Sequence, residues 1–151
     1  MTMMSSKCHR PANLPGMWRL ASRPGVRVHV LGAGLACCSL EVEAAAASGL
    51  LVRSGDGTED HAATVLVVAG TITRALEPAV EALYAQAAES GPVRVMSFGA
   101  CATSGGPYWD APTIVQGVRG IPVATYVPGC PPRPEALVAE LERLVDSMAA
   151  A

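Results

Sequence analysis

The sequence has few aromatic residues, few charges and no excess of basic groups. Aromatic side chains make up 4% of its 151 residues and charged ones 16%, and the formal net charge is −2. Without a basic surface, or aromatic rings on which bases could stack, the chain is not expected to bind nucleic acid. Half of the residues are hydrophobic, which indicates that partners cover part of the surface.

Long hydrophobic runs are missing as well. The longest stretches without charge, residues 28–40 and 62–73, are too short and too rich in glycine, alanine or threonine to cross a bilayer. Residues 1–25 mix basic residues with prolines and contain no apolar run, so they do not predict a secretory signal. We therefore expect a cytoplasmic protein with no transmembrane segment. In that compartment its five cysteines are metal ligands or catalytic thiols rather than disulfides.

Short apolar runs alternate with helical patterns along the chain. Four runs predict buried parallel strands, at residues 26–31, 64–69, 93–98 and 122–127. Apolar residues with helical spacing predict a helix over residues 78–89 and another over 134–148. The alanine run at residues 44–47 belongs to a further helix after Cys38.

This alternation indicates one three-layer α/β domain over residues 26–148, preceded by an N-terminal arm over residues 1–25. Its sheet is expected to be parallel and flavodoxin-like, with four strands or slightly more, joined by right-handed crossovers. Ligands of open α/β sheets bind at the edge formed by the carboxyl ends of the strands. Any site of this chain is therefore expected at that edge.

Four cysteines fall at that predicted edge. Cys37 and Cys38 follow the first strand, Cys101 follows the third and Cys130 follows the fourth, each in a turn rich in glycine or proline. Glycine lets the backbone approach a bulky inorganic group, and the exposed amides can donate hydrogen bonds to it. Four convergent thiolates match the ligand set of a [4Fe–4S] cluster, which we expect here.

Other interpretations of the cysteines remain open at this point. Buried cysteines often serve as small hydrophobic residues, and a structural zinc ion also takes four thiolates. Zinc sites, however, usually use C-x₂₋₄-C pairs, which this chain lacks. Adjacent Cys37 and Cys38 can serve one centre only if a bent or helical turn brings both sulfurs to it. Cys8, in the expected arm, is predicted to be a spare thiol.

Four motifs together resemble one family, and they occur at residues 37–41, 68–73, 99–106 and 127–137. The chain resembles, over about residues 27–144, the 20 kDa (B-type) subunit of NADH-quinone oxidoreductase, respiratory complex I. Small subunits of nickel–iron hydrogenases are related, but the tandem Cys37-Cys38 favours the complex I branch.

The resemblance implies an electron-transfer subunit that is not catalytic alone. It implies that Cys37, Cys38, Cys101 and Cys130 hold one [4Fe–4S] cluster, which passes electrons to quinone at the interface with the large, 49 kDa-type subunit. Other iron–sulfur and membrane subunits of an ion-translocating complex would be further partners. The expected location is the inner face of the cell membrane, as a peripheral part of that complex.

Further residues are implied to lie around the cluster. These are Gly34, Glu41, Gly70, Thr71, Ala102 and Gly129. The turns at Gly34, Ala102 and Gly129 would tune the cluster potential. Glu41 is either a carboxylate in the first turn of a helix, near free amides, or a group that couples protons to the cluster.

The chain departs from the family pattern at two places. Where the family commonly has a Ser-Pro-Arg-Gln stretch before the second strand, this chain has acidic residues and His61, which is either solvated or a protonatable replacement. Arg74 replaces an uncharged residue and supplies a shifted positive charge. These changes leave a second hypothesis open, a cluster-bearing small subunit of a hydrogenase-like or other membrane-associated redox complex without quinone reduction.

Overall fold

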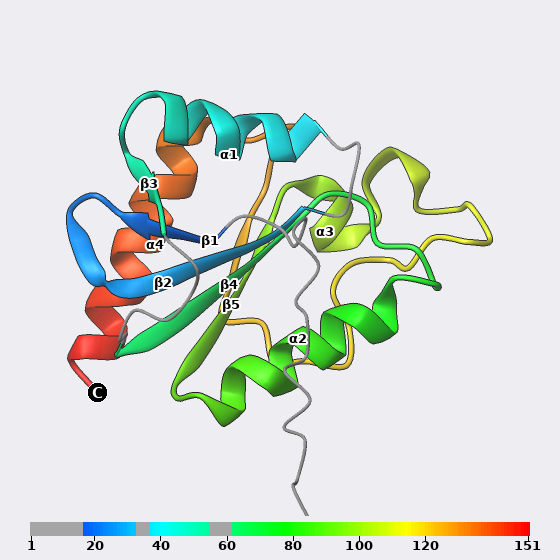
Figure 1. Cartoon of the computed structure of the whole chain (residues 1–151). Helices are drawn as coiled ribbons and strands as arrows, with labels where there is room; N and C mark the ends of the chain where they lie inside the picture. Colours follow the sequence, from blue (N-terminus) through cyan, green and yellow to red (C-terminus); the bar gives the residue numbers. More distant parts are fainter. Residues whose placement is uncertain (1–16, 33–36, 55–61) are drawn as a thin grey trace, which may run out of the picture.

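A computed structural model describes residues 17–32, 37–54 and 62–151, which form an α/β structure around one sheet (Figure 1). The sheet has six strands in the order β3-β1-β2-β4-β5-β6. The strands are β1 (Met17–Leu20), β2 (Arg23–Gly32), β3 (Leu51–Arg53), β4 (Ala63–Ala69), β5 (Val93–Phe98) and β6 (Thr125–Val127). The helices are α1 (Cys37–Ala47), α2 (Glu77–Glu89), α3 (Ala100–Ser104), the 3₁₀ turn η1 (Gly106–Tyr108) and α4 (Pro134–Ala149).

Strands β2, β4, β5 and β6 run parallel, which confirms the predicted α/β class. β5 covers the predicted residues 93–98, whereas β6 is shorter than the predicted 122–127. The reason is that Pro122 has no N–H to donate. The pairing with β5 begins only where the Ala124 N–H donates to the Val95 carbonyl, at 2.8 Å.

Two short strands extend the sheet on the other side of β2. β1 pairs antiparallel with both β2 and β3. Trp18 and Leu20 of β1 are buried on either side of half-buried Arg19, and the Arg53 guanidinium lies 4.9 Å from the centre of the Trp18 ring. Residues 17–25, expected to belong to an N-terminal arm, thus lie in the sheet. Residues 1–16 of that expected arm lie outside the described residues.

Helices cover both faces of the sheet, so apolar residues form a buried core on each face. On one face α1 and α4 pack together and against the sheet, with Val42, Leu137 and Leu141 in the core (Figure 1). On the other face α2 and α3 contribute Val80 and Ala102. The helices predicted over residues 78–89 and 134–148 are confirmed as α2 and α4. No helix in the described part of the chain combines the length and apolarity that a bilayer span requires.

Candidate metal centre

The carboxyl ends of the parallel strands meet at one edge of the sheet, and three cysteine-bearing segments begin there. α1 starts at Cys37, and α3, which carries Cys101, starts directly after β5. Cys130 follows β6 within three residues. In Figure 1 the first turn of α1 and the whole of α3 lie at the same, right-hand end of the sheet. The edge predicted to carry the cysteines is therefore the edge that carries them.

The two adjacent cysteines lie in the first turn of α1. Because α1 begins at Cys37, neighbouring side chains point about 100° apart around its axis. Cys37 is exposed, whereas Cys38 is buried with 2% of its surface accessible. The tandem pair thus has the helical backbone that two neighbouring ligands of one centre require.

The surroundings of Cys38 raise the pKa of its thiol. The pKa of the Cys38 thiol is raised to about 12, and burial is the largest cause. Negative charge on Cys37 and on Cys101, a hydrogen bond with the Cys37 side chain, and negative charge on Cys130 all add to that rise in pKa. The other three cysteines therefore lie near enough to Cys38 to disfavour its ionisation.

Two glycines form walls against two of the sulfurs. Gly99 has φ +93°, and a Cβ atom placed on it would lie 2.4 Å from Cys38 Sγ. Gly106 has φ +56°, and its Cβ would lie 2.8 Å from Cys101 Sγ. Neither position has space for a side chain, so backbone lies directly against the thiols.

Backbone hydrogen bonds tie the turn before Cys101 to the turn before Cys130. The Gly99 N–H donates to the Val127 carbonyl and the Ala100 N–H to the Gly129 carbonyl, both at 2.8 Å. Each bond joins the β5–α3 connection to the end of β6. The positions of Cys101 and Cys130 are therefore fixed relative to each other by main-chain contacts.

A pair of hydroxyl groups, which the sequence reasoning missed, supports the same turn. The Thr103 hydroxyl donates to the Gly99 carbonyl at 2.8 Å, and Ser97 Oγ lies 3.2 Å from Thr103 Oγ1. Ser97 is fully buried. The signal that could have found it is a polar residue inside the apolar run at residues 93–98.

The other residues expected around the cluster can be placed by their element and their burial. Gly129 precedes Cys130, Ala102 follows Cys101 and is buried, and Gly70 and Thr71 follow β4 at the same edge. Glu41 is half-buried one turn into α1, and the charges that raise the pKa of Cys38 come from the three cysteines rather than from it.

Three residues singled out in the sequence, Cys8, Gly34 and His61, lie outside the described residues. The structure therefore leaves the three expectations about them as predictions.

Arg74 has a structural contact that the sequence does not reveal. Its Nε donates to the Pro112 carbonyl at 2.8 Å, which joins the β4–α2 connection to the loop after η1. Between these two segments lies a surface pocket of about 490 Å³, and its lining includes Arg74, Glu77, Trp109, Asp110, Gln116 and Arg119. The positive charge of Arg74 is thus placed at this pocket.

Comparison with known proteins gives the family. The sequence model described as "NADH ubiquinone oxidoreductase, 20 Kd subunit" matches residues 33–144, which is most of the chain and includes all four cysteines of the site. The chain belongs to this family. The family resemblance inferred from the four motifs is thereby confirmed.

Individual relatives agree with the family assignment. The chain is 46% identical over 126 residues to a B-type subunit of NADH-quinone oxidoreductase from Salinispora tropica, covering 80% of this chain and 66% of the relative. It is 44% identical over 125 residues to a B-type subunit of the same enzyme from Streptomyces griseus, covering 80% of this chain and 52% of the relative. The chain thus spans between about half and two thirds of the length of these relatives.

A solved structure shares the fold. The chain matches a chain in the structure of the membrane-bound sulfane sulfur reductase, an archaeal respiratory membrane complex, with a TM-score of 0.59 and 23% sequence identity. The match covers 78% of this chain and 68% of the other. At that identity the likeness supports the α/β architecture.

Proposed function

We propose that this chain is an electron-transfer subunit that holds one [4Fe–4S] cluster on Cys37, Cys38, Cys101 and Cys130. The observation that carries the proposal is that the three segments bearing these cysteines meet at one edge of the sheet, where Gly99 lies against Cys38 Sγ and its N–H is bonded to the end of β6. A bound cluster would accept and release one electron at a time, with no substrate chemistry of its own. The chain's residues supply the four thiolates, exclude water on the Cys38 side and bring glycine backbone against the sulfurs.

The pattern of cysteines favours a cluster over a structural zinc ion, because zinc sites usually use C-x₂₋₄-C pairs, which this chain lacks. A [4Fe–4S] cube takes one thiolate from each of four cysteines. Within the described ranges, no group of three or more His, Cys, Asp or Glu side chains is already arranged to hold a metal ion.

The family supports a place in a quinone-reducing complex. Relatives are named as subunits of NADH-quinone oxidoreductase. We propose that the cluster passes electrons to quinone at an interface with a large, 49 kDa-type subunit. Other iron–sulfur and membrane subunits would hold the chain at the inner face of the cell membrane, in a complex that translocates ions.

A second candidate function follows from the sequence itself. The acidic segment that ends at His61 stands where the family commonly has Ser-Pro-Arg-Gln, so a basic group is missing from that place. This favours a cluster-bearing small subunit of a hydrogenase-like or other redox complex without quinone reduction. Quinone-dependent activity of the purified assembly would support the first function, and its absence in an assembly with an intact, reducible cluster would support the second.

Cluster assembly on single-cysteine variants tests the ligand set. The full chain, reconstituted without oxygen, should bind about four irons and four sulfides. Each of Cys37→Ser, Cys38→Ser, Cys101→Ser and Cys130→Ser should lower iron content or destabilise the cluster, whereas Cys8→Ser, the matched control, should leave it unaltered. One equivalent of zinc without acid-labile sulfide would refute the cluster, and equal loss in Cys8→Ser would refute the ligand set.

A further inference from the structure

Ser97 and Thr103 form a hydrogen-bond chain with a defined direction. The Thr103 hydroxyl donates to the Gly99 carbonyl at 2.8 Å, and the Thr103 backbone N–H donates to the same oxygen at 3.1 Å. A hydroxyl has one proton to donate. Since Thr103 uses it on Gly99, Ser97 must be the donor across the 3.2 Å contact with Thr103 Oγ1.

The chain ends at the residue where the cysteine segments meet. The Gly99 backbone faces Cys38 Sγ so closely that a Cβ would lie 2.4 Å away. Its N–H is bonded to the end of β6, and its neighbour Ala100 is bonded to Gly129, next to Cys130. Cys101 follows two residues later. A shift of the Gly99 peptide would therefore move several cysteine-bearing segments relative to one another.

We propose that Ser97 and Thr103 are positioning residues for the cluster, which fix the Gly99 peptide and, through it, the spacing of Cys38 and Cys101. This inference rests on the proposed function, because it concerns the cluster those cysteines hold. The Thr103 hydroxyl directs its hydrogen at the Gly99 carbonyl, and the Ser97 hydroxyl directs its hydrogen at Thr103. Loss of either hydroxyl would free the Gly99 peptide, change the backbone that lies against Cys38 Sγ and so shift the reduction potential of the cluster.

If the two hydroxyls only stabilised α3, removing either of them would have the same effect as removing the hydroxyl of Ser104. Serine and threonine in helices often donate to the carbonyl four residues earlier, and Ser104 does so on the same helix, with its hydroxyl 3.3 Å from the Ala100 carbonyl. Ser104 is exposed. Ser104→Ala is therefore the matched control, because it removes the same type of bond without touching the Ser97–Thr103–Gly99 chain.

The decisive measurements are made on the reconstituted cluster in the full chain. They are its midpoint potential and the shape of its electron paramagnetic resonance signal. Thr103→Val and Ser97→Ala should shift the potential and change the shape of the signal, with iron content retained. Thr103→Ser, which keeps the hydroxyl, should restore both, and Ser104→Ala should match the wild type. A wild-type potential and signal in both Thr103→Val and Ser97→Ala would overturn the proposal.

A measurement without iron separates this proposal from the proposed function. In the iron-free full chain, hydrogen exchange of a peptide covering residues 97–105 should be faster in Thr103→Val than in the wild type or Ser104→Ala. If the wild type takes up no iron, the proposed function fails and the effect on potential fails with it. Unchanged exchange together with an unchanged potential would overturn the positioning role alone, because wild-type cluster binding would still stand.

Discussion

Glycine backbone lies directly against the sulfurs of Cys38 and Cys101, and this contact makes Gly99 sensitive to substitution. Replacing Gly99 by alanine would place a methyl group 2.4 Å from Cys38 Sγ, in a backbone conformation with φ +93°. We expect Gly99→Ala to lose most of its cluster while the sheet and helices persist. Iron and sulfide content, with far-ultraviolet circular dichroism, would measure this.

The matched control for that substitution is Gly91→Ala. Gly91 also has a positive φ, +143°, but nothing lies within 4 Å of the Cβ that alanine would add. It therefore carries the backbone strain without the contact with sulfur. Equal loss of iron in both variants would show that strain, rather than the Gly99–Cys38 contact, determines cluster binding.

The four thiols differ in their exposure to solvent. This difference predicts the order in which they are alkylated in the iron-free chain. Cys37 and Cys130 are exposed, whereas Cys38 and Cys101 are buried. Alkylation requires the thiolate, and with a pKa of about 12 Cys38 stays protonated at neutral pH. Brief treatment with iodoacetamide at about pH 8 should modify Cys37 and Cys130 first, as read by mass spectrometry of peptides. Early modification of Cys38 would contradict this burial pattern.

At the residue scale, the sequence predicts the cysteines better than their surroundings. The four thiols could be placed because each follows a predicted strand or its turn, and strand order along the chain determines which edge they share. The Ser97–Thr103 pair could not be derived, because a hydroxyl's partner depends on how α3 folds back over the end of β5. The contact of Arg74 with Pro112 joins segments 38 residues apart and is equally hidden.

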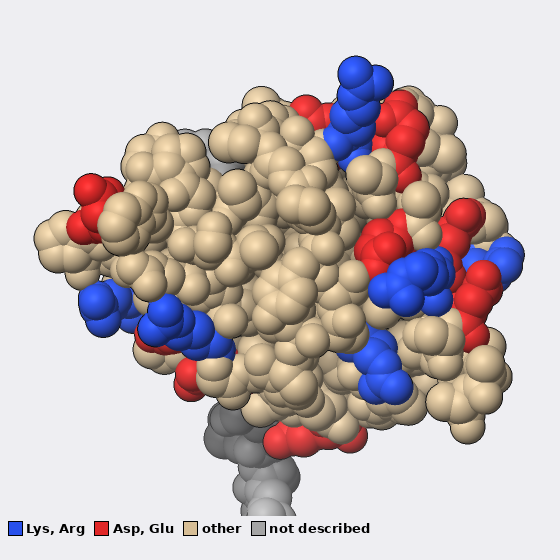
Figure 2. Space-filling model, turned by 180° about the vertical axis from the view of Figure 1, so that it is seen from behind, with Lys and Arg blue, Asp and Glu red and all other residues tan. Residues whose placement is uncertain are grey.

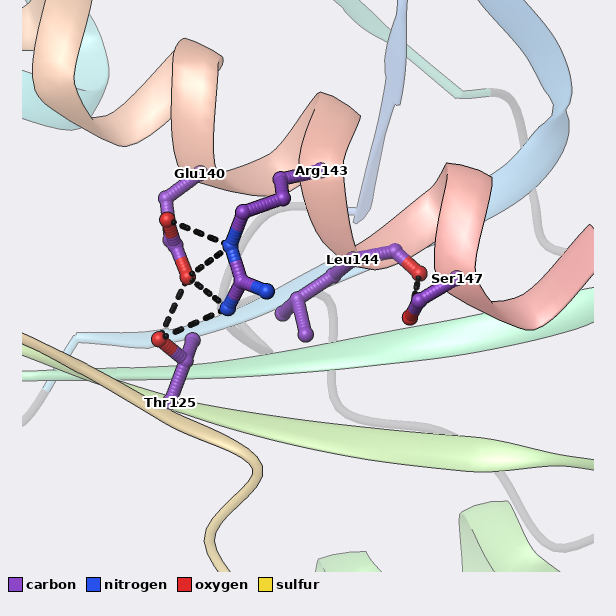
Figure 3. A network of polar contacts seen from close by, with 5 residues as sticks. All are labelled: Thr125, Glu140, Arg143, Leu144 and Ser147. Carbon is purple, nitrogen blue, oxygen red and sulfur yellow. Dashed lines mark hydrogen bonds and ion pairs between the residues drawn. The ribbon is translucent and has the colours of Figure 1, made fainter.

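At the scale of elements, a polar cluster fastens the edge strand β6 to α4 (Figure 3). Arg143 Nε donates to both carboxylate oxygens of Glu140 at 3.0 Å, and the Thr125 hydroxyl of β6 donates to Glu140 as well. The hydrogen bond from Arg143 holds the pKa of Glu140 below its usual value; Thr125 adds to this effect and partial burial opposes it. Through β6, this cluster also steadies the chain that leads to Cys130.

The lowered pKa of Glu140 predicts how stability depends on pH. Because the folded-state pKa lies below the unfolded one, the contribution is present above the unfolded pKa and is lost as pH falls through the folded value. Glu140→Gln should therefore be less stable than the wild type at about pH 7, by up to about 1 kcal/mol, and the difference should disappear in acid. Urea unfolding at both pH values would measure it.

Glu89→Gln, in the last turn of α2, serves as the control for this comparison. Glu89 is exposed and has no hydrogen bond or ion pair within the described ranges. Its substitution should shift stability little at either pH. A pH-independent loss in Glu140→Gln would instead assign the effect of that residue to packing.

The elements that the sequence predicts are those with strong local patterns. α4 is predictable because its buried residues follow one helical stripe, and β4 and β5 because their apolar runs are nearly continuous. β1 and β3 have only four and three residues. β1 is a strand because it pairs with β2 and β3, and β3 because it pairs with β1. Such non-local pairing leaves little trace in a short segment.

At the scale of the whole molecule, large apolar side chains remain on the surface. Leu40, two residues after Cys38, is 69% exposed, and Tyr108 and Trp109 beside α3 are exposed by 57% and 59%. Figure 2 shows, on the opposite face from Figure 1, a broad central area without Lys, Arg, Asp or Glu. Large exposed apolar side chains favour association with a protein or membrane surface.

We therefore expect the chain alone to associate with itself, and a large-subunit partner to prevent this. Light scattering should show oligomers or aggregates for the isolated chain and a defined complex after co-expression with the large subunit of its own complex. The cluster should also resist oxygen longer in that complex, because the partner would cover the exposed cysteines. A monomer with an air-stable cluster would contradict an obligate subunit.

The central strand β4 has a consequence for how this molecule unfolds. Its residues alternate between the two cores: Val65, Val67 and Ala69 face α1 and α4, whereas Leu66 and Val68 face α2. β4 is thus part of both cores, so neither core can unfold while the other keeps its packing. Heat should take the described fold through a single cooperative transition, in which the two halves of the protein share one melting temperature.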